Sequence, residues 1–330
     1  MNFIGMDIHK QFTVAVVKDY LGDQLANERF DNSKDNFKDF LKDYPASETK
    51  IVIESTCVWE YIYELLDEFG YEVKLSNPVK TKAIASARIK TDHVDASTLA
   101  DLLRGNLVAE SYIPPKQIRR LREITRERRT FVKQTTQIKN KIHAILIKRG
   151  LKLPSATFCK KSILWLKTFE DDDLITHYVD LLGFHSEKLG DIDDKIREIA
   201  NENKNAKLLM TLPGIAELRA VDLVAEIGEI ERFENSSKLC SYAGLVPSVR
   251  QSGNSLRFGK LIRQSNKVLK SVFIEASWTA VRTKEMNQFG RFYRKLSKKK
   301  GKQKAICATA RKMCSTAYAM LAKDQEFIIL

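Results

Sequence analysis

The sequence predicts an α/β domain at the N-terminus, then a long helical arm, then a mainly helical C-terminal part. Short apolar runs alternate with amphipathic segments up to residue 115, and residues 118–147 contain neither glycine nor proline. Helical periodicity dominates the remainder. With 43% hydrophobic residues in a chain of 330, each part can bury a core. The expected parts are residues 1–115, 116–209 and 210–330.

The first part is predicted to follow the order βββαβαβα. Its strands are recognised by β-branched and apolar residues bounded by turn signals such as Leu21-Gly22-Asp23. Ser33 is a suitable N-cap for the first helix, and Gly70 ends the second. The predicted strands are residues 3–7, 13–17, a segment ending near Phe30, 51–54 and 71–75.

The arm is predicted from two helical patterns. Residues 118–147 combine an apolar stripe with a basic face, and residues 161–209 contain a second, strongly charged helical pattern. Together they indicate an antiparallel helical hairpin or a coiled-coil-like arm. Two further basic helices are expected around residues 260–283 and 302–323.

Positive charge is concentrated in two blocks. The chain has 56 Lys+Arg against 42 Asp+Glu, a net charge of +14. Residues 116–152 carry +11 and residues 245–330 carry +15, whereas residues 1–115 and 153–244 each carry −6. Such blocks attract polyanions, because each neutralised phosphate releases condensed counterions. Nucleic acid is therefore the expected partner.

Other partners and compartments are poorly supported. No apolar run approaches the roughly 20 residues of a membrane-spanning helix, so no membrane partner is expected and the location is predicted to be cytoplasmic. The five cysteines are scattered and form no C-x-x-C pair. Neither a disulfide framework nor a zinc knuckle is expected.

Four carboxylates of the first part are candidate metal ligands. Asp7 and Glu54 end apolar strands, and Asp92 and Asp95 share one face at the start of a helix. Alone, Asp92 would be a plausible N-cap. Carboxylates gathered at strand ends would repel one another unless a cation joined them, and Mg²⁺, or Mn²⁺ in its place, suits such oxygen ligands. This pattern favours an RNase H-like, RuvC-like domain with phosphodiester chemistry.

The motifs resemble those of a known family. The segments Phe3-Ile4-Gly5-Met6-Asp7, Ile53-Glu54-Ser55-Thr56 and Lys90-Thr91-Asp92-His93-Val94-Asp95 are similar to the DEDD motifs of the insertion-sequence 110 transposases, which include the pilin-gene-inverting recombinases. Later segments, from Leu212-Pro213-Gly214-Ile215 to Gln251-Ser252-Gly253, follow in the family's order. Ala216 stands where a helix-hairpin-helix turn would have its second glycine.

The resemblance implies a prokaryotic DNA transposase or site-specific recombinase with a C-terminal transposase domain. The implied catalytic residues are Asp7, Glu54, Asp92 and Asp95, as a Mg²⁺ site, and Ser252 as nucleophile. It further implies a structured non-coding guide RNA that pairs with double-stranded donor and target DNA. The protein would associate with the nucleoid when acting.

Independent of the family, Ser252 lies in a polar loop between arginines that could hold a phosphate, although a plain turn serine has the same pattern. Other basic positions are candidates for nucleic-acid contact, and Gly214 is a candidate phosphate cradle at a helix start. The nucleic-acid-binding candidates are Arg119, Arg120, Arg126, Arg129, Lys133, Gly214, Arg250, Arg257, Lys260, Arg263, Lys298, Lys299 and Lys300.

Two alternatives remain open at this point. A Holliday-junction or RNase H-type endonuclease would use water as the nucleophile, and a non-catalytic regulator would tolerate the loss of Asp7. A homo-oligomer, either a dimer or a tetramer, is expected because strand exchange requires two duplexes to be held at once. In such an assembly the carboxylates of one subunit are predicted to meet Ser252 of another.

Overall fold

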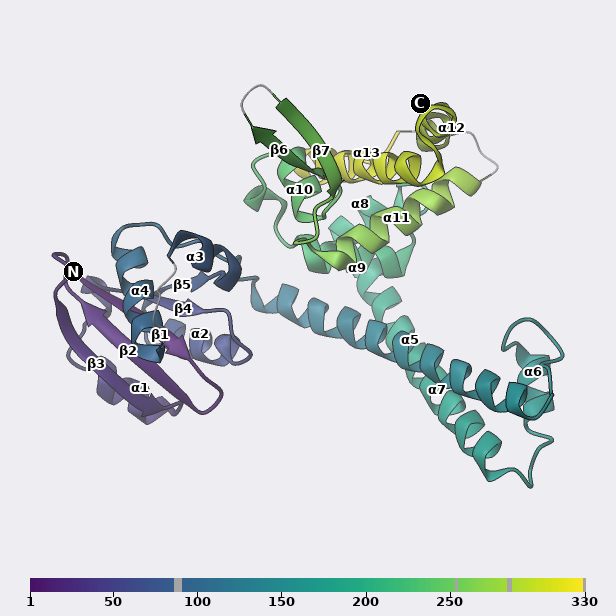
Figure 1. The fold of residues 1–330 in the computed structure, drawn as a ribbon, viewed down its shortest axis with the longest axis horizontal. Coiled ribbons are helices and arrows are strands. Elements are labelled where there is room, and N and C mark those ends of the chain that lie inside the picture. Colours follow the sequence, from purple (N-terminus) through teal and green to yellow (C-terminus); the bar gives the residue numbers. More distant parts are fainter. Residues whose placement is uncertain (86–90, 253–254, 284–286, 329–330) are drawn as a thin grey trace. The chain divides into compact units, whose positions relative to one another are not determined.

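The computed structural model describes residues 1–85, 91–252, 255–283 and 287–328 (Figure 1). The chain divides into two compact units, Met1–Ile113 and Pro114–Leu330, and each is described by itself below. The second unit contains both the predicted arm and the predicted C-terminal part. None of the described helices is long and apolar enough to cross a membrane.

The first unit is built on a mixed five-stranded sheet, as the sequence predicts. The strands lie in the order β3-β2-β1-β4-β5, so β1 is central. β1 pairs antiparallel with β2 and parallel with β4, and β4 pairs parallel with β5. The strands are β1 (Asn2–Ile8), β2 (Phe12–Lys18), β3 (Gln24–Asp31), β4 (Thr49–Glu54) and β5 (Glu72–Ser76).

Helices cover both faces of this sheet. Ile4, Met6 and Ile8 of β1 point into a core that includes Phe37 of α1 (Lys34–Leu41) and Leu66 of α2 (Trp59–Glu68). On the other face, α4 (Asp92–Arg104) packs against β1 and β2. The sheet is thus covered on both sides, which explains why its central strands are apolar nearly throughout. A 3₁₀ turn (Ala46–Glu48) and α3 (Pro78–Ile84) complete the unit.

The second unit begins with the two long helices of the arm. α5 (Lys116–Lys148) and α7 (Asp173–Glu202) run antiparallel and are joined through α6 (Lys160–Leu166) (Figure 1). Ion pairs between Arg128 and Asp193 and between Arg149 and Asp172 fix the direction of the pairing. Apolar side chains, including Ile142, pack between the helices toward the α6 end. The predicted helical hairpin is therefore present.

The remaining helices share one large core with the near end of the arm. The predicted helix start near residue 260 is wrong, because residues 255–261 pair as a strand and the helix begins only after the N-cap Asn266. The elements are α8 (Lys204–Met210), α9 (Glu217–Ile227), a 3₁₀ turn (Ile230–Arg232), α10 (Ser236–Tyr242), β6 (Pro247–Ser252), β7 (Ser255–Leu261), α11 (Lys267–Arg282), α12 (Gln288–Lys300) and α13 (Lys302–Lys323).

Candidate active site

Asp7 occupies a nearly buried position on the central strand of the first unit. It is 7% exposed and lies opposite Val14 in the β1–β2 register. Because side chains alternate along a strand, Gly5 and Asp7 lie on the face opposite to the one that carries Met6. That face is the one covered by α4.

Gly5 is what allows α4 to approach the sheet so closely. A Cβ atom at this position would lie 2.1 Å from the carbonyl oxygen of Ala96 and 2.5 Å from the amide nitrogen of Ala100. Only glycine avoids this overlap with helix backbone. The close contact brings the first turn of α4, with Asp92 and Asp95, toward the end of β1.

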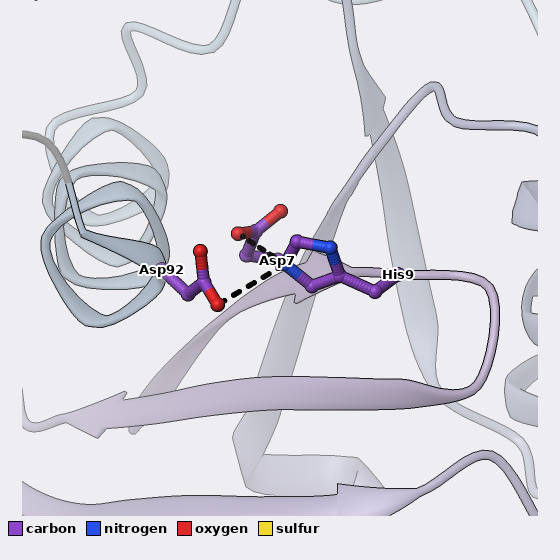
Figure 2. Close-up of side chains that lie close together, drawn as sticks. All are labelled: Asp7, His9 and Asp92. Atoms are coloured by element: carbon purple, nitrogen blue, oxygen red, sulfur yellow. Dashed lines mark hydrogen bonds and ion pairs between the residues drawn. The ribbon is translucent and has the colours of Figure 1, made fainter.

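The two aspartates Asp7 and Asp92 meet at an imidazole (Figure 2). Nε2 of His9 lies 3.2 Å from Oδ2 of Asp7 and 3.3 Å from Oδ2 of Asp92. Within the described residues, these three side chains form a group whose ligand atoms lie within 4.8 Å of one another. Asp92 is the first residue of α4 and not its N-cap, since the hydroxyl of Thr91 accepts from the Val94 amide.

The surroundings of Asp7 disfavour its ionised form. Burial raises the pKa of Asp7, and the negative charges of Asp92 and Asp95 raise it further, while His9 opposes both effects. Asp95 is therefore close enough to act on Asp7 electrostatically. A bound cation would relieve the repulsion among these carboxylates.

Glu54 reaches the same end of the sheet from the neighbouring strand. It is the last residue of β4, and the parallel pairing of Met6 with Ile53 places it beside Asp7 in the register. Glu54 and Asp95 lie outside the close group of Asp7, His9 and Asp92. Asp7, Asp92 and Asp95 thus lie toward the end of β1 and Glu54 at the end of β4, and of the four only Asp7 and Asp92 belong to the close group.

The close group fits a divalent cation. Two carboxylates supply hard oxygen ligands, which suit both Mg²⁺ and Mn²⁺, and the imidazole adds a nitrogen ligand of the kind that binds transition ions. His9 is absent from the site predicted by sequence. Its signal is its place two residues after Asp7, because residues i and i+2 of an extended segment share a face.

Ser252 belongs to the second unit, at the tip of a two-stranded ribbon. It is the last residue of β6 and pairs with Ser255, the first residue of β7. Arg250 pairs with Arg257 two steps down the ribbon. The predicted serine loop is therefore a hairpin tip, and Gly253, next to the serine, lies outside the described residues.

Several arginines of α5 are engaged inside the second unit. Arg119 is 7% exposed and donates to the carbonyl oxygen of Pro114. Arg126 donates from Nε and Nη2 to the two carboxylate oxygens of Glu226, at 3.1 and 3.3 Å, and Arg129 donates to Oδ2 of Asp222 at 2.7 Å. These contacts give the three arginines a structural role beside the predicted one.

Glu226 is the centre of this internal network. It is 1% exposed, and its Oε2 also accepts from Nδ2 of Asn266 at 2.7 Å. Burial alone would raise the pKa of Glu226, but the hydrogen bonds from Arg126 and Asn266 and the nearby positive charge lower it overall. Asn266 also caps α11, so the network joins the arm to the segment that follows the serine ribbon. No local pattern in the sequence indicates the pairing of Arg126 with Glu226, because 100 residues separate them.

Gly214 has a packing reason of its own. Its φ is +88°, and a Cβ there would lie 2.3 Å from the carbonyl oxygen of Ala276 in α11. Glycine thus lets the turn before α9 rest directly on another helix. Its carbonyl oxygen accepts from Arg219 at 2.7 Å.

Eight further predicted nucleic-acid contacts lie on the surface, while the side chain of Arg250 lies outside the described structure. The side chain of Arg120 is 67% exposed and pairs with Glu123. The lysine tract, expected between helices, forms the last turn of α12. The remaining exposed members are Lys133, Arg257, Lys260, Arg263, Lys298, Lys299 and Lys300.

Comparison with known proteins points in one direction. A DEDD transposase model, described as Transposase, matches residues 4–148, and a model described as Transposase IS116/IS110/IS902 family matches residues 206–294. The pilin gene-inverting protein of Moraxella bovis is 28% identical over 294 residues, which cover 86% of this chain and 83% of that protein.

Two further relatives are named as transposases. The transposase for insertion sequence element IS1111A of Coxiella burnetii is 21% identical over 84% of this chain and 79% of that protein. The putative transposase y4qE of Sinorhizobium fredii is 24% identical over 66% of this chain. The chain spans only about half of that last relative, 55% of its length.

Proposed function

The chain belongs to the IS110 transposase family and is a DNA transposase, and we propose that it cuts and rejoins DNA through Ser252 with the help of a metal site at Asp7. The observation that carries the proposal is the group of Asp7, His9 and Asp92. It lies within the segment matched by the DEDD transposase model, whose name already implies divalent-metal chemistry.

The proposed reaction exchanges phosphoester bonds. The Ser252 hydroxyl oxygen, once deprotonated, attacks a DNA phosphorus, so that an Oγ–P bond forms and one P–O bond of the strand breaks. The strand end with the phosphate stays on the protein and the other leaves as a hydroxyl. Attack of a hydroxyl end on the phosphoserine reverses the step and rejoins DNA without an external energy source.

The carboxylates would hold the cation in this scheme. Asp7 and Asp92, with His9 bridging them, are the proposed ligands, and Glu54 and Asp95 are proposed to complete the DEDD set. When bound, Mg²⁺ or Mn²⁺ supplies stabilisation of charge on the attacked phosphate. Asp7 keeps its position because the sheet and α4 enclose it.

The arrangement of the first unit supports an RNase H-like assignment. Three antiparallel strands followed by two parallel ones, in the order β3-β2-β1-β4-β5, place a carboxylate on the central strand and another on its neighbour. We propose that this unit is the RuvC-like domain of the enzyme.

A covalent adduct is the test of the serine mechanism. DNA from the protein's native flanks, incubated with the full chain and Mg²⁺ and then stopped in denaturant, should yield a DNA–protein species that Ser252→Ala lacks. Ser255→Ala, on the facing strand, is the matched control and should keep the adduct. Cleavage by Ser252→Ala without any adduct would favour the water-using endonuclease, which the separate group at Asp7 could also serve.

We propose that the two basic blocks divide the nucleic acids between them. The guide RNA is assigned to the first unit with α5, and DNA mainly to residues 245–330. Charge reversal in the full chain tests this, with Arg120→Glu expected to weaken RNA binding and Lys299→Glu to weaken DNA binding. Both side chains lie on the surface, so the fold should tolerate either change. Equal losses for both ligands in both variants would contradict the division.

The catalytic site is proposed to be shared between subunits of a homo-oligomer. The carboxylates lie in one compact unit and Ser252 in the other, so the halves can come from different chains. Mixing Asp7→Ala protein with Ser252→Ala protein should restore part of the recombination activity. Mixed oligomers that remain inactive would show instead that each chain builds its own site.

A further inference from the structure

A cleft of about 540 Å³ lies in the second unit, between α5, α7, α9 and α11. Five basic and three acidic side chains line it. Four of the basic ones also contact carboxylates, those of Asp193, Asp222, Asp194 and Glu275. The positive charge that the cleft offers to a ligand is therefore mainly that of Lys133. All of its walls come from one compact unit. The basic residues are Arg128, Arg129, Lys133, Arg197 and Arg219.

The beginning of α9 forms part of the wall of the cleft, through residues 216–219. The N-cap, Ala216, has no side-chain hydrogen bond to the first turn, and the first backbone bond of the helix runs from the Ala220 amide to the Ala216 carbonyl. The amides of residues 217–219 precede that bond. Together with the helix dipole, such amides attract a phosphate.

A buried acceptor forms a second, independent feature of the cleft. The side chain of Asp222 is only 10% exposed, and its Oδ2 accepts from Arg129. Its Oδ1 is buried and has no hydrogen-bond partner among the described residues. An unsatisfied buried carboxylate oxygen is costly, so a ligand that brings a donor to this position gains more than an ordinary hydrogen bond.

These two features together select a class of ligand. The cleft offers donors and positive charge for a phosphate, and a carboxylate oxygen for a hydroxyl. The sugar–phosphate backbone of DNA has no hydrogen-bond donor, whereas every RNA nucleotide carries a 2′-hydroxyl beside its phosphate. A ribonucleotide satisfies both halves of the cleft at once.

We propose that this cleft binds a nucleotide of an RNA strand, with its phosphate at the start of α9 and at Lys133 and its 2′-hydroxyl donating to Oδ1 of Asp222. The proposal rests on RNA being a partner of the chain and is independent of the Ser252 reaction. It gives Asp222 a role in distinguishing RNA from DNA, and it makes Lys133 a phosphate contact.

The test compares two oligonucleotides on the full chain. A 20-nucleotide single-stranded RNA and the DNA of the same sequence are titrated at several salt concentrations, with hydrogen exchange measured on α9. RNA should bind about tenfold to 100-fold more tightly, the range expected for a hydrogen bond to a charged group. RNA should also protect the amides of residues 217–221, and DNA should protect them less.

Variants separate the two contacts. Asp222→Ala should bring RNA affinity down to that of DNA, while Lys133→Ala should weaken both and lower the slope of log affinity against log salt by about 0.7. Lys152→Ala removes an exposed lysine from the same basic block without touching the cleft and controls for overall charge. Lys133→Ala changes only a surface side chain, so its result stands even if Asp222→Ala does not fold.

Several results would overturn the proposal. The first three come from the oligonucleotide titrations and the variants. They are equal affinities of the wild-type chain for RNA and DNA, an unchanged preference in folded Asp222→Ala, and RNA binding without protection of α9. Protection of α9 by millimolar adenosine monophosphate but not by the RNA strand would likewise overturn the assignment to a strand. A serine adduct formed normally while these experiments fail would leave the catalytic proposal intact.

Discussion

Replacing Asp7 by asparagine should separate metal binding from folding. The two side chains have nearly the same shape, and position 7 is 7% exposed. In the metal-free protein, burial and the charges of Asp92 and Asp95 raise the pKa of Asp7. A carboxyl group whose pKa is higher in the folded state costs stability as the pH rises above its unfolded value of 3.8. Metal-free Asp7→Asn should therefore be at least as stable as the wild type at pH 7.

Bound metal should reverse this order of stability, because the wild type gains more from the metal than Asp7→Asn does. A ligand at 100 times its dissociation constant stabilises the folded state by about 2.7 kcal/mol, which is a roughly 100-fold slowing of amide exchange where exchange requires unfolding. The central strands β1 and β4 are the segments in which to measure it. Asp7→Asn loses one of the three close ligands, so the slowing should fall below about tenfold at the same metal concentration.

Hydrogen exchange with Mg²⁺, with Mn²⁺ and with a chelator supplies the measurement without any DNA. Asp39→Asn is the matched control, because it also removes one negative charge from the first unit. The side chain of Asp39 is 78% exposed and pairs with Lys42. The control should respond to metal like the wild type. A metal response of Asp7→Asn equal to that of the wild type would refute the ligand assignment.

Two other substitutions test the framework around the sites. Gly5→Ala should cost about 1–3 kcal/mol of stability in thermal unfolding and reduce DNA cleavage, because its Cβ overlaps the backbone of α4. Gly190→Ala on α7 is the control: its Cβ meets open space, so the variant should be neutral or slightly stabilised in the same measurement. Glu226→Gln should lower stability at pH 7 by about 3–5 kcal/mol, because Arg122, whose side chain is only 14% exposed, loses the carboxylate beside it. Glu123→Gln, in an exposed pair, should lower it by less than about 1 kcal/mol. The Glu226 difference should shrink below pH 4.5 in urea unfolding at several pH values, because the folded pKa of that group is lowered.

The sheet and the arm were predictable because their signals are local. Five strands appear where turn residues bound short apolar runs, and the long helix covers the stretch without glycine or proline. The β6–β7 ribbon is not predicted from the sequence, and the predicted helix begins near residue 260, inside β7. Basic residues such as Lys260 fit either conformation. Tertiary pairing of β6 with β7 decides between them.

Within the candidate site, the carboxylates could be predicted and their spacing could not. Position at the end of an apolar strand marks Asp7 and Glu54 in the sequence itself. Gly5 allows α4 to pack close to the sheet, and this close packing brings Asp92 near enough to Asp7 for His9 to contact both carboxylates. That distance depends on a contact between residues about 90 positions apart, which no local pattern encodes.

The net charge of a sequence block likewise does not show which of its basic side chains face solvent and which pair with carboxylates inside the fold. Residues 116–152 carry +11, yet Arg126 and Arg129 of that block meet carboxylates of α9 inside the fold. Their neighbour Lys133 lies on the surface, beside the same cleft. The pairing of Arg129 satisfies one oxygen of Asp222 and leaves the other unpaired within the described structure. The ion pairs that hold the arm to α9 thereby also leave a site for a ligand with both a phosphate and a hydroxyl. In this proposal the basic face of α5 combines a structural role with a role in recognition.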